Sequence, residues 1–194
     1  MKNVILFDVG GVLLQWKDKW LFDEISHELD IPFEEIKDKF NANISELFIG
    51  KISEEQFWNK ISDGGKINHE IISQTFLKRS MLDTKVLNLA RSIKKQGFDI
   101  GILSNITPET RRILPKQWID EFDHVFFSDQ IKLAKPDPKI FLYVKEKLSE
   151  HQIVFIDDKQ ENVDAAKRYG IISILFEEYQ SLHEELAKQI LVAP

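Results

Sequence analysis

The second half of the chain alternates between two hydrophobic patterns, and this alternation restricts its fold more than any other feature. Short apolar runs occupy residues 98–103, 124–127, 153–156 and 171–176. Apolar residues at helical spacing occupy residues 84–96, 108–114, 137–148, 162–169 and 182–191. Short continuous apolar runs predict strands buried on both faces. Their alternation with helices predicts an α/β fold with a doubly wound, Rossmann-like parallel sheet.

The first half begins with one more such run and then changes character. Residues 4–7 are continuously apolar and predict the first strand, whereas residues from about 17 to 82 follow helical spacing, with breaks at 30–32, 49–50 and 63–65. Ser53 and Gln56 have the spacing of a capping box at a helix start. We therefore predict a core of residues 1–14 and 83–194, with a small all-helical cap of residues 15–82 inserted after the first strand.

Composition narrows the class of partner. The chain of 194 residues has a formal net charge of -6 and no cysteine. The charge argues against nucleic acid as the main partner, and the absence of cysteine excludes disulfides and thiolate metal sites. The first apolar run is short and ends at Asp8, which predicts neither a signal peptide nor a membrane span. We expect a cytoplasmic protein, a monomer or weak homodimer, that acts on a small molecule.

Polar residues follow three of the predicted strands. Asp8 ends the first run, Ser104 and Asn105 follow the second, and Asp157 and Asp158 follow the run at 153–156. Lys135 precedes the helix that leads to this last strand. Ligands of open parallel sheets bind beyond the carboxyl ends of the strands. The sequence therefore predicts one site that contains three carboxylates, a hydroxyl and a lysine.

This set of side chains suits phosphoryl transfer, in which a carboxylate attacks phosphorus and water then cleaves the aspartyl-phosphate. Mg²⁺ prefers oxygen ligands and would offset the repulsion between Asp8 and the phosphate, as would Lys135. The hydroxyl of Ser104 and the amide of Asn105 would donate hydrogen bonds to the phosphate oxygens. The predicted reaction is hydrolysis of a small phosphomonoester.

Four motifs, in this order, resemble those of the haloacid dehalogenase-like hydrolases. They are Asp8 in the run 7–12, Ser104 in 103–105, Lys135, and Asp157-Asp158 with Asn162. The resemblance implies that Asp8 is the nucleophile and an Mg²⁺ ligand, that Asp158 is the main acidic metal ligand, and that Asp157 and Asn162 support the metal site. It further implies that Lys135, also a catalytic residue, and Ser104 bind phosphate, and that the helical insertion is a cap that selects the substrate.

One position departs from the family pattern. The family's usual first motif has a second Asp two residues after the nucleophile, as general acid and base, and here that residue is Gly10. Its backbone carbonyl still serves as the implied Mg²⁺ ligand, but loss of the acid typically costs ~10²- to 10⁴-fold in rate. Three outcomes stay open: the enzyme acts on substrates with good leaving groups, it borrows an acid from the cap or from Asp157, or it is catalytically weak. Activity is favoured, because the chain is most similar to an active subset with Gly here, which includes bacterial α-glucose-1-phosphate phosphatases and resembles the phosphatase-like domain of epoxide hydrolases. A sugar phosphate is the expected substrate.

Two other functions stay open at the sequence level. A catalytically inactive relic would keep metal and phosphate binding but show no turnover. A 2-haloacid dehalogenase would use Asp8 to displace halide and would not need Mg²⁺, and the acidic pair Asp157-Asp158 argues against it.

Several other residues have a simpler interpretation. Lys132 and Lys139 compete with Lys135 but are expected on the surface. The histidines show no spacing typical of a zinc site, so surface or packing positions are expected for them. The aromatic residues of the insertion are expected in its core, whereas Trp16 is expected at the mouth of the pocket; the others are Trp20, Phe22, Phe40, Phe48, Phe57 and Trp58.

Overall fold

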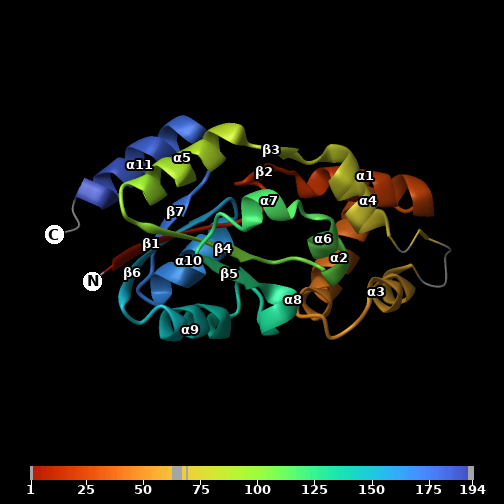
Figure 1. Ribbon diagram of the computed structural model, residues 1–194. Helices are drawn as coiled ribbons and strands as arrows, with labels where there is room; N and C mark the ends of the chain where they lie inside the picture. The colour runs from red at the N-terminus through yellow and green to blue at the C-terminus, as the bar shows by residue number, and fades with distance from the viewer. Residues whose placement is uncertain (1, 63–66, 69, 192–194) are drawn as a thin grey trace.

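A parallel sheet forms the centre of the molecule. The computed structural model describes residues 2–62, 67–68 and 70–191. Within these residues, five parallel strands form one sheet in the order β5-β4-β1-β6-β7 (Figure 1). The strands are β1 (Lys2–Phe7), β4 (Asp99–Ser104), β5 (His124–Phe127), β6 (His151–Asp157) and β7 (Ile172–Leu175). The predicted α/β fold is confirmed, with small shifts at the strand ends.

Helices cover both faces of this sheet. One face packs against α5 (Thr84–Lys95) and α11 (Tyr179–Leu191), and the other against α9 (Pro138–Lys147) and α10 (Gln160–Arg168) (Figure 1). Two predicted helix boundaries are seen directly: the Asp137 side chain accepts a hydrogen bond from the Lys139 N–H, and Gly97 after α5 has φ 93°. The sheet is therefore wound on both sides, as predicted.

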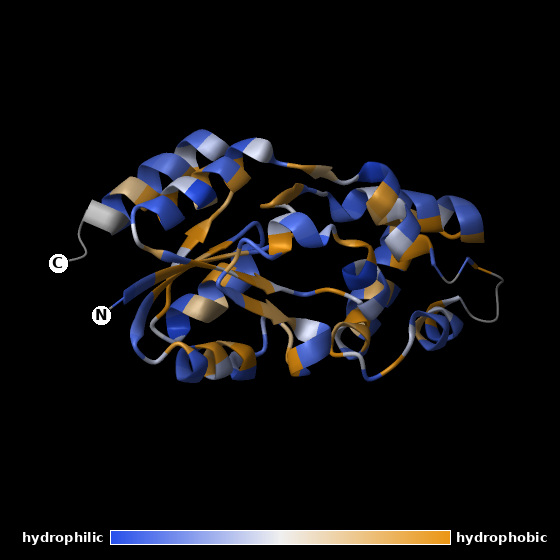
Figure 2. Cartoon of the chain, in the orientation of Figure 1, coloured by the Kyte–Doolittle hydropathy of each residue, from blue (hydrophilic) through white to orange (hydrophobic). Residues whose placement is uncertain are grey.

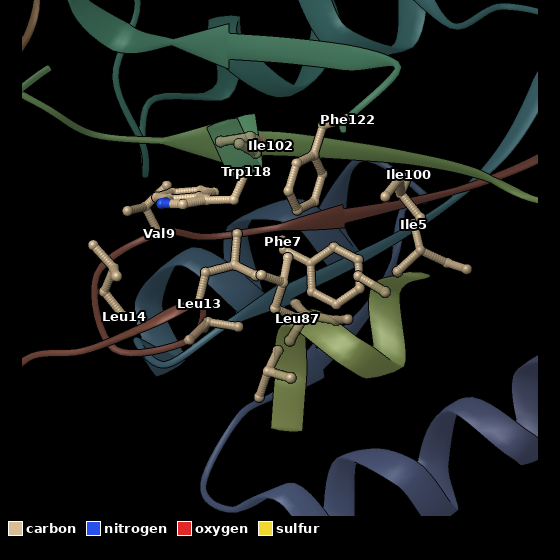
Figure 3. Close-up of a cluster of buried hydrophobic side chains, with 14 of the residues drawn as sticks. Ile5, Phe7, Val9, Leu13, Leu14, Leu87, Ile100, Ile102, Trp118 and Phe122 are labelled. Atoms are coloured by element: carbon tan, nitrogen blue, oxygen red, sulfur yellow. The ribbon is translucent and has the colours of Figure 1, made fainter. Parts of the chain in front are cut away.

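The burial of β1 explains why residues 4–7 are continuously apolar. Ile5 and Phe7 point into the cluster beneath α5 and α11, whereas Val4 and Leu6 point into the cluster beneath α9. Figure 3 shows Phe7 packed beside Leu87 of α5 in the first cluster. The strands form an apolar band through the core in Figure 2. Because successive side chains of a strand face opposite sides, the stretch of β1 that is buried on both faces, residues 4–7, is apolar at every position.

The helical insertion has an apolar cluster of its own, which includes Phe22, Phe40, Phe57 and Trp58. Its helices are α1 (Asp18–Leu29), α2 (Phe33–Phe48), α3 (Glu54–Ile61) and α4 (Ile71–Arg79), at one end of the molecule (Figure 1). Two of the predicted breaks separate these helices, and the third, at 63–65, lies outside the described residues. The predicted capping box is present at α3, where Ser53 Oγ accepts from the Gln56 N–H at 3.2 Å and Gln56 Oε1 accepts from the Ser53 N–H at 2.9 Å.

A two-stranded antiparallel ribbon joins the insertion to the sheet. It pairs β2 (Leu14–Gln15) with β3 (Met81–Leu82), so the chain leaves and re-enters the core side by side. The prediction that helix continues to residue 82 is therefore wrong there. Two-residue strands are too short to show a period of two. Of three short helices, α6 (Pro108–Ile113) was predicted, whereas α7 (Lys116–Ile119) and α8 (Ser128–Ile131) were not. Within the described ranges, the structure contains no helix with the length and apolar character needed to span a bilayer.

Candidate active site

The candidate site lies where β4, β1 and β6 end. Phe7 of β1 pairs with Ile102 of β4 and with Ile156 of β6, so Asp8 and Asp157 leave the sheet at the same level. The chain runs from β1 outward through β4 and β5, and then crosses to β6 on the other side of β1. This reversal of strand order is the place where open α/β sheets bind ligands.

A buried lysine ammonium joins two of the carboxylates. Lys135 Nζ lies 3.1 Å from Asp8 Oδ2 and 2.5 Å from Asp157 Oδ2, and it donates a hydrogen bond to the Leu103 carbonyl at 2.9 Å. Its side chain is 1% exposed. Burial opposes the charged form, but Asp157 and Asp8 together hold the pKa of Lys135 above its ordinary value. Lys132 and Lys139 are exposed, so Lys135 is the lysine that meets the acidic residues.

Asn105 fixes the backbone that carries this lysine. Its side-chain Nδ2 donates to the Lys135 carbonyl at 2.7 Å, and its Oδ1 accepts from the Lys135 N–H at 2.9 Å. Both polar atoms of the Asn105 side-chain amide are therefore hydrogen-bonded to the backbone of Lys135. The sequence could not indicate this pairing, because the two residues lie on different segments of the chain.

Asp157 is fully engaged by protein groups. While its Oδ2 faces Lys135, its Oδ1 accepts from the Lys159 N–H at 2.8 Å and from Asn162 Nδ2 at 2.9 Å. Asn162 lies in the first turn of α10 and is itself buried. These contacts occupy both oxygens of Asp157.

Burial disfavours the charged forms of Asp8 and Asp158. Burial raises the pKa of Asp8 to about 6, against the opposing effects of Lys135 and of a hydrogen bond from Ser104. One oxygen of Asp8 accepts from the Val9 N–H at 2.7 Å. Burial, followed by repulsion from Asp8 and Asp157, raises the pKa of Asp158 to about 7. A cation bound beside both carboxylates would favour their charged forms.

The donor set fits a hard divalent cation. Oxygens of Asp8, Asp157 and Asp158 all lie within 4.8 Å of one another. Asp158 Oδ1 is buried and has no hydrogen-bond partner among the described residues. Gly11 leaves room for this carboxylate, because a Cβ there would lie 2.2 Å from Asp158 Oδ2, and its φ of +85° also favours glycine. Asp158, with its unpartnered oxygen, and the neighbouring Asp8 are therefore the carboxylates best placed to hold Mg²⁺.

Gly10 lies beside the ring of Trp16. A Cβ at Gly10 would meet Trp16 Cδ1 at 3.5 Å, an ordinary contact distance. Trp16 Nε1 donates to Asp18 Oδ1 at 2.9 Å, and Asp18 Oδ2 lies 2.7 Å from Lys159 Nζ. The ring lines the cavity, in agreement with the position expected for Trp16. Asp18 and Lys159 line it as well, although no sequence motif pointed to them.

A cavity of about 550 Å³ connects these residues to the helical insertion. Besides Trp16 and Asp18, the insertion contributes a largely apolar wall: Leu21, Phe40, Asn41, Ile44, Ser45, Phe48 and Phe76. Phe40 and Phe48 were expected only in the core of the insertion, and that interpretation is incomplete. Phe40, Ile44 and Phe48 recur every four residues along α2, and the same spacing describes a core-facing stripe. The sequence pattern therefore could not separate cavity lining from core.

Two histidines meet at the opposite end of the sheet. His124 Nε2 and His151 Nε2 each lie 3.1 Å from Asp99 Oδ2. Both are half-buried, in line with the surface or packing positions expected for the histidines. Their grouping with Asp99 was not predicted, because β4, β5 and β6 bring together residues that are far apart in sequence. His69 lies outside the described residues.

Comparison with known proteins agrees with this geometry. A family model described as haloacid dehalogenase-like hydrolase matches residues 2–170. A phosphorylated carbohydrates phosphatase from Thermotoga maritima is 44% identical over 87% of this chain and 82% of the relative. A sesquiterpene phosphatase from Aspergillus oryzae is 26% identical over 87% of each chain. The chain is also 32% identical to the bifunctional epoxide hydrolase 2 of Rattus norvegicus over 96% of its own length, but it spans only 38% of that relative.

A solved structure has the same fold. A haloacid dehalogenase family enzyme from Bacteroides thetaiotaomicron, in complex with magnesium and inorganic phosphate, superposes with a TM-score of 0.69. The match covers 94% of this chain and 99% of that one at 23% identity.

Proposed function

The chain belongs to the haloacid dehalogenase-like hydrolases, and from this membership we propose that it is a Mg²⁺-dependent phosphatase that hydrolyses a small phosphomonoester through an aspartyl-phosphate on Asp8. The observation that carries the proposal is the cluster of carboxylate oxygens of Asp8, Asp157 and Asp158, within 4.8 Å of one another, beside the buried ammonium of Lys135. The phosphatase relatives support the reaction class, and the magnesium complex of the Bacteroides enzyme supports the metal.

Asp8 acts first, as the nucleophile. A carboxylate oxygen attacks phosphorus, the bond from phosphorus to the ester oxygen breaks, and the alkoxide leaves and takes its proton from water. Water then attacks the phosphorus of the aspartyl-phosphate and releases inorganic phosphate, which restores the carboxylate. Asp8, Asp158 and the Gly10 carbonyl would hold Mg²⁺, whose positive charge offsets the repulsion between the carboxylate and the phosphate.

The remaining polar groups hold the phosphate in line. Lys135 supplies a fixed positive charge, since three partners already orient its ammonium. The Ser104 hydroxyl donates a hydrogen bond to Asp8. With substrate bound, it would donate to a phosphate oxygen instead. The Asn105 side chain is bound to Lys135, so its predicted phosphate contact falls to its backbone N–H.

The environment of Gly10 argues for good leaving groups. Asp157 cannot replace the missing acid, because Lys135, Asn162 and the Lys159 N–H occupy both of its oxygens. From the insertion, Asp18 lines the cavity but is paired with Lys159. These partners occupy both carboxylates, so the leaving alcohol must depart with little assistance. A borrowed acid is therefore the weakest of the three outcomes left open by the sequence.

Two substrate classes follow from different observations. The Thermotoga relative supports the sugar phosphate expected from the sequence. The apolar wall that Phe40, Ile44 and Phe48 form over the site favours an ester whose alcohol is aliphatic or aromatic, and the Aspergillus relative supports this second candidate.

In both cases the insertion acts as the cap, with the predicted division into residues 15–82 and the surrounding core. The cytoplasmic location and the state of monomer or weak homodimer stay predictions.

The decisive experiment measures phosphate release from p-nitrophenyl phosphate, a panel of sugar phosphates and a prenyl monophosphate. Each substrate is assayed with Mg²⁺ and with EDTA, for the unaltered protein and for Asp8→Asn. We expect Mg²⁺-dependent turnover that Asp8→Asn abolishes. Mg²⁺ binding without turnover on any substrate would instead indicate a relic. Metal-independent halide release from a 2-haloacid would indicate a dehalogenase.

A further inference from the structure

A second group of ligand-type side chains lies at the amino-terminal edge of the sheet. Asp99 opens β4, His124 opens β5 and His151 opens β6. One ligand atom from each lies within 4.8 Å of the others. The strands separate this group from Asp8, Ser104 and Asp157, which stand at the carboxyl-terminal edge. It is therefore distinct from the catalytic site.

The donor atoms are close to the geometry that a small cation requires. Both histidine Nε2 atoms lie 3.1 Å from the same oxygen, Asp99 Oδ2. Ligands at 2.0–2.1 Å from a tetrahedral Zn²⁺ stand about 3.3 Å apart, so small side-chain movements would suffice. The side chains of His124, His151 and Asp99 are 26%, 15% and 19% exposed, which leaves access for a cation and for a water as fourth ligand.

We propose that Asp99, His124 and His151 form a zinc site at the amino-terminal edge of the sheet. Two imidazoles and one carboxylate select a borderline metal such as Zn²⁺ over Mg²⁺, which prefers an all-oxygen set. Such a site would link β5 and β4 to β6, although β1 lies between β4 and β6 in the sheet. Its role is to stabilise the fold, and it does not depend on the proposed phosphatase activity.

Two local features oppose tight binding. Lys2 Nζ lies 3.5 Å from Asp99 Oδ1 and brings a competing positive charge, although its side chain is 69% exposed and free to turn away. Metal at Nε2 moves the ring proton of each histidine to Nδ1, and His151 Nδ1 is buried without a hydrogen-bond partner among the described residues. Metal-bound histidines usually donate this second proton, so its lack of an acceptor lowers the affinity. We therefore expect Zn²⁺ to be removable by a chelator.

The test is calorimetric titration of the metal-free protein with Zn²⁺ in the presence of excess Mg²⁺, which occupies the catalytic carboxylates. We expect one Zn²⁺ per chain. His124→Gln and His151→Gln should each weaken binding by about 100-fold or more, because even the loss of a supporting group around a metal costs 10- to 100-fold. Lys2→Gln should tighten binding. Co²⁺ in place of Zn²⁺ should give the visible absorption of a tetrahedral site in the unaltered protein and lose it in both histidine variants.

Control variants distinguish Zn²⁺ binding at this site from Zn²⁺ binding elsewhere and from loss of folding. His183→Gln changes an exposed histidine on α11, outside the group, and should leave Zn²⁺ binding unchanged. Asp158→Asn should also leave it unchanged, since Asp158 belongs to the other edge. Thermal unfolding without Zn²⁺ verifies that each variant folds. Absence of Zn²⁺ binding in the Mg²⁺-saturated protein, or equal binding in the His124→Gln variant, would overturn the proposal and leave the three residues as a hydrogen-bonded packing group.

Discussion

Gly11 gives the sharpest test of the metal site at the scale of one residue. A Cβ at this position would overlap the Asp158 carboxylate, at 2.2 Å from Oδ2. We expect Gly11→Ala to displace Asp158 and to lower Mg²⁺-dependent kcat/KM at least about 100-fold, since a catalytic metal contributes several kcal/mol to the transition state. Phosphate release and Mg²⁺ binding by calorimetry measure the two losses.

Gly97→Ala is the matched control for this change. Gly97 has φ +93°, close to the +85° of Gly11, but nothing lies within 4 Å of its added Cβ. The left-handed conformation itself costs a side chain about 1–2 kcal/mol, so both variants lose stability for the same reason. Only Gly11→Ala should lose Mg²⁺ affinity. Equal loss in the two variants would show that backbone strain, rather than contact with Asp158, is responsible.

Gly10→Asp tests whether the missing general acid limits the reaction. The backbone at Gly10 is outside the positive-φ region, and the added Cβ meets Trp16 only at an ordinary 3.5 Å, so the change can be accommodated once the indole ring turns. We expect kcat on alkyl phosphates, which have poor leaving groups, to rise about 100-fold, within the range of general acid catalysis. The rate on p-nitrophenyl phosphate, whose leaving group needs no proton, should change little. An equal change on both substrates would contradict this role.

The sequence predicted the site well where a residue directly follows a buried strand. Asp8, Ser104 and Asp157 converge because parallel strands end at one edge, a consequence of the fold alone. The roles of Asn105 and Asp18 were not predictable, since their partners Lys135 and Lys159 lie on other segments. Pairings across segments depend on three-dimensional placement, which no local pattern encodes.

At the scale of elements, one contact between α3 and α6 titrates near neutral pH. Glu54 begins α3, and its Oε1 accepts from Thr107 Oγ1 at 2.9 Å, where Thr107 is the N-cap of α6. Burial is the main cause that raises the pKa of Glu54 from 4.5 to about 7. Its Oε2 is buried with no hydrogen-bond partner among the described residues. The insertion is therefore held to the core by a carboxyl group that is more stable with a proton.

This contact makes stability depend on pH. Between pH 4.5 and about 7 the folded protein keeps the Glu54 proton that the unfolded chain has lost, so the free energy of unfolding falls as pH rises through this window. The loss is complete above pH 7 and amounts to at most about 3 kcal/mol. Glu54→Gln keeps the shape without the ionisation. We expect urea unfolding at about pH 5 and about pH 8.5 to show a smaller pH-dependent loss in the variant than in the unaltered protein.

Because Asp8 and Asp158 contribute a pH dependence of the same sign, the comparison between variant and unaltered protein isolates Glu54. Thr107→Val provides a second comparison, since it removes the hydroxyl donor but not the carboxyl group. It should keep a pH-dependent loss, in contrast to Glu54→Gln. Identical pH dependence in Glu54→Gln and in the unaltered protein would show that the group stays ionised when folded.

Elements with a local signal were predictable, and elements held by pairing were not. The strands buried on both faces, the capping box of Ser53 and the Asp137-Pro138 helix start are all encoded within a few residues. The ribbon of β2 and β3 exists only because residues 14–15 and 81–82 lie side by side. The grouping of His124 with His151 depends on sheet order in the same way.

At the scale of the whole molecule, the cavity belongs to neither the sheet nor the insertion alone. The strand ends contribute carboxylates and Ser104, the segment before α9 contributes Lys135, and the insertion contributes an apolar wall. In the proposed function, the strand ends and Lys135 bind the phosphate and the insertion contacts the alcohol. Changes on the insertion should therefore alter the choice of substrate without altering phosphate binding, and Ile44 offers a direct test, because it lines the cavity from α2.

Ile44→Asn should lower kcat/KM for a prenyl monophosphate by about 10-fold or more, because contact with an aliphatic side chain of this size contributes about 1.5–3 kcal/mol when fully buried. Inhibition by inorganic phosphate should stay unchanged, since the carboxylates and Lys135 are untouched. Leu142→Asn, on α9 and 52% exposed, makes the same kind of change away from the cavity and should affect neither quantity. If Ile44→Asn instead leaves the prenyl ester unaffected and improves turnover of a sugar phosphate, the apolar wall does not bind the alcohol, and the sugar phosphate becomes the better assignment.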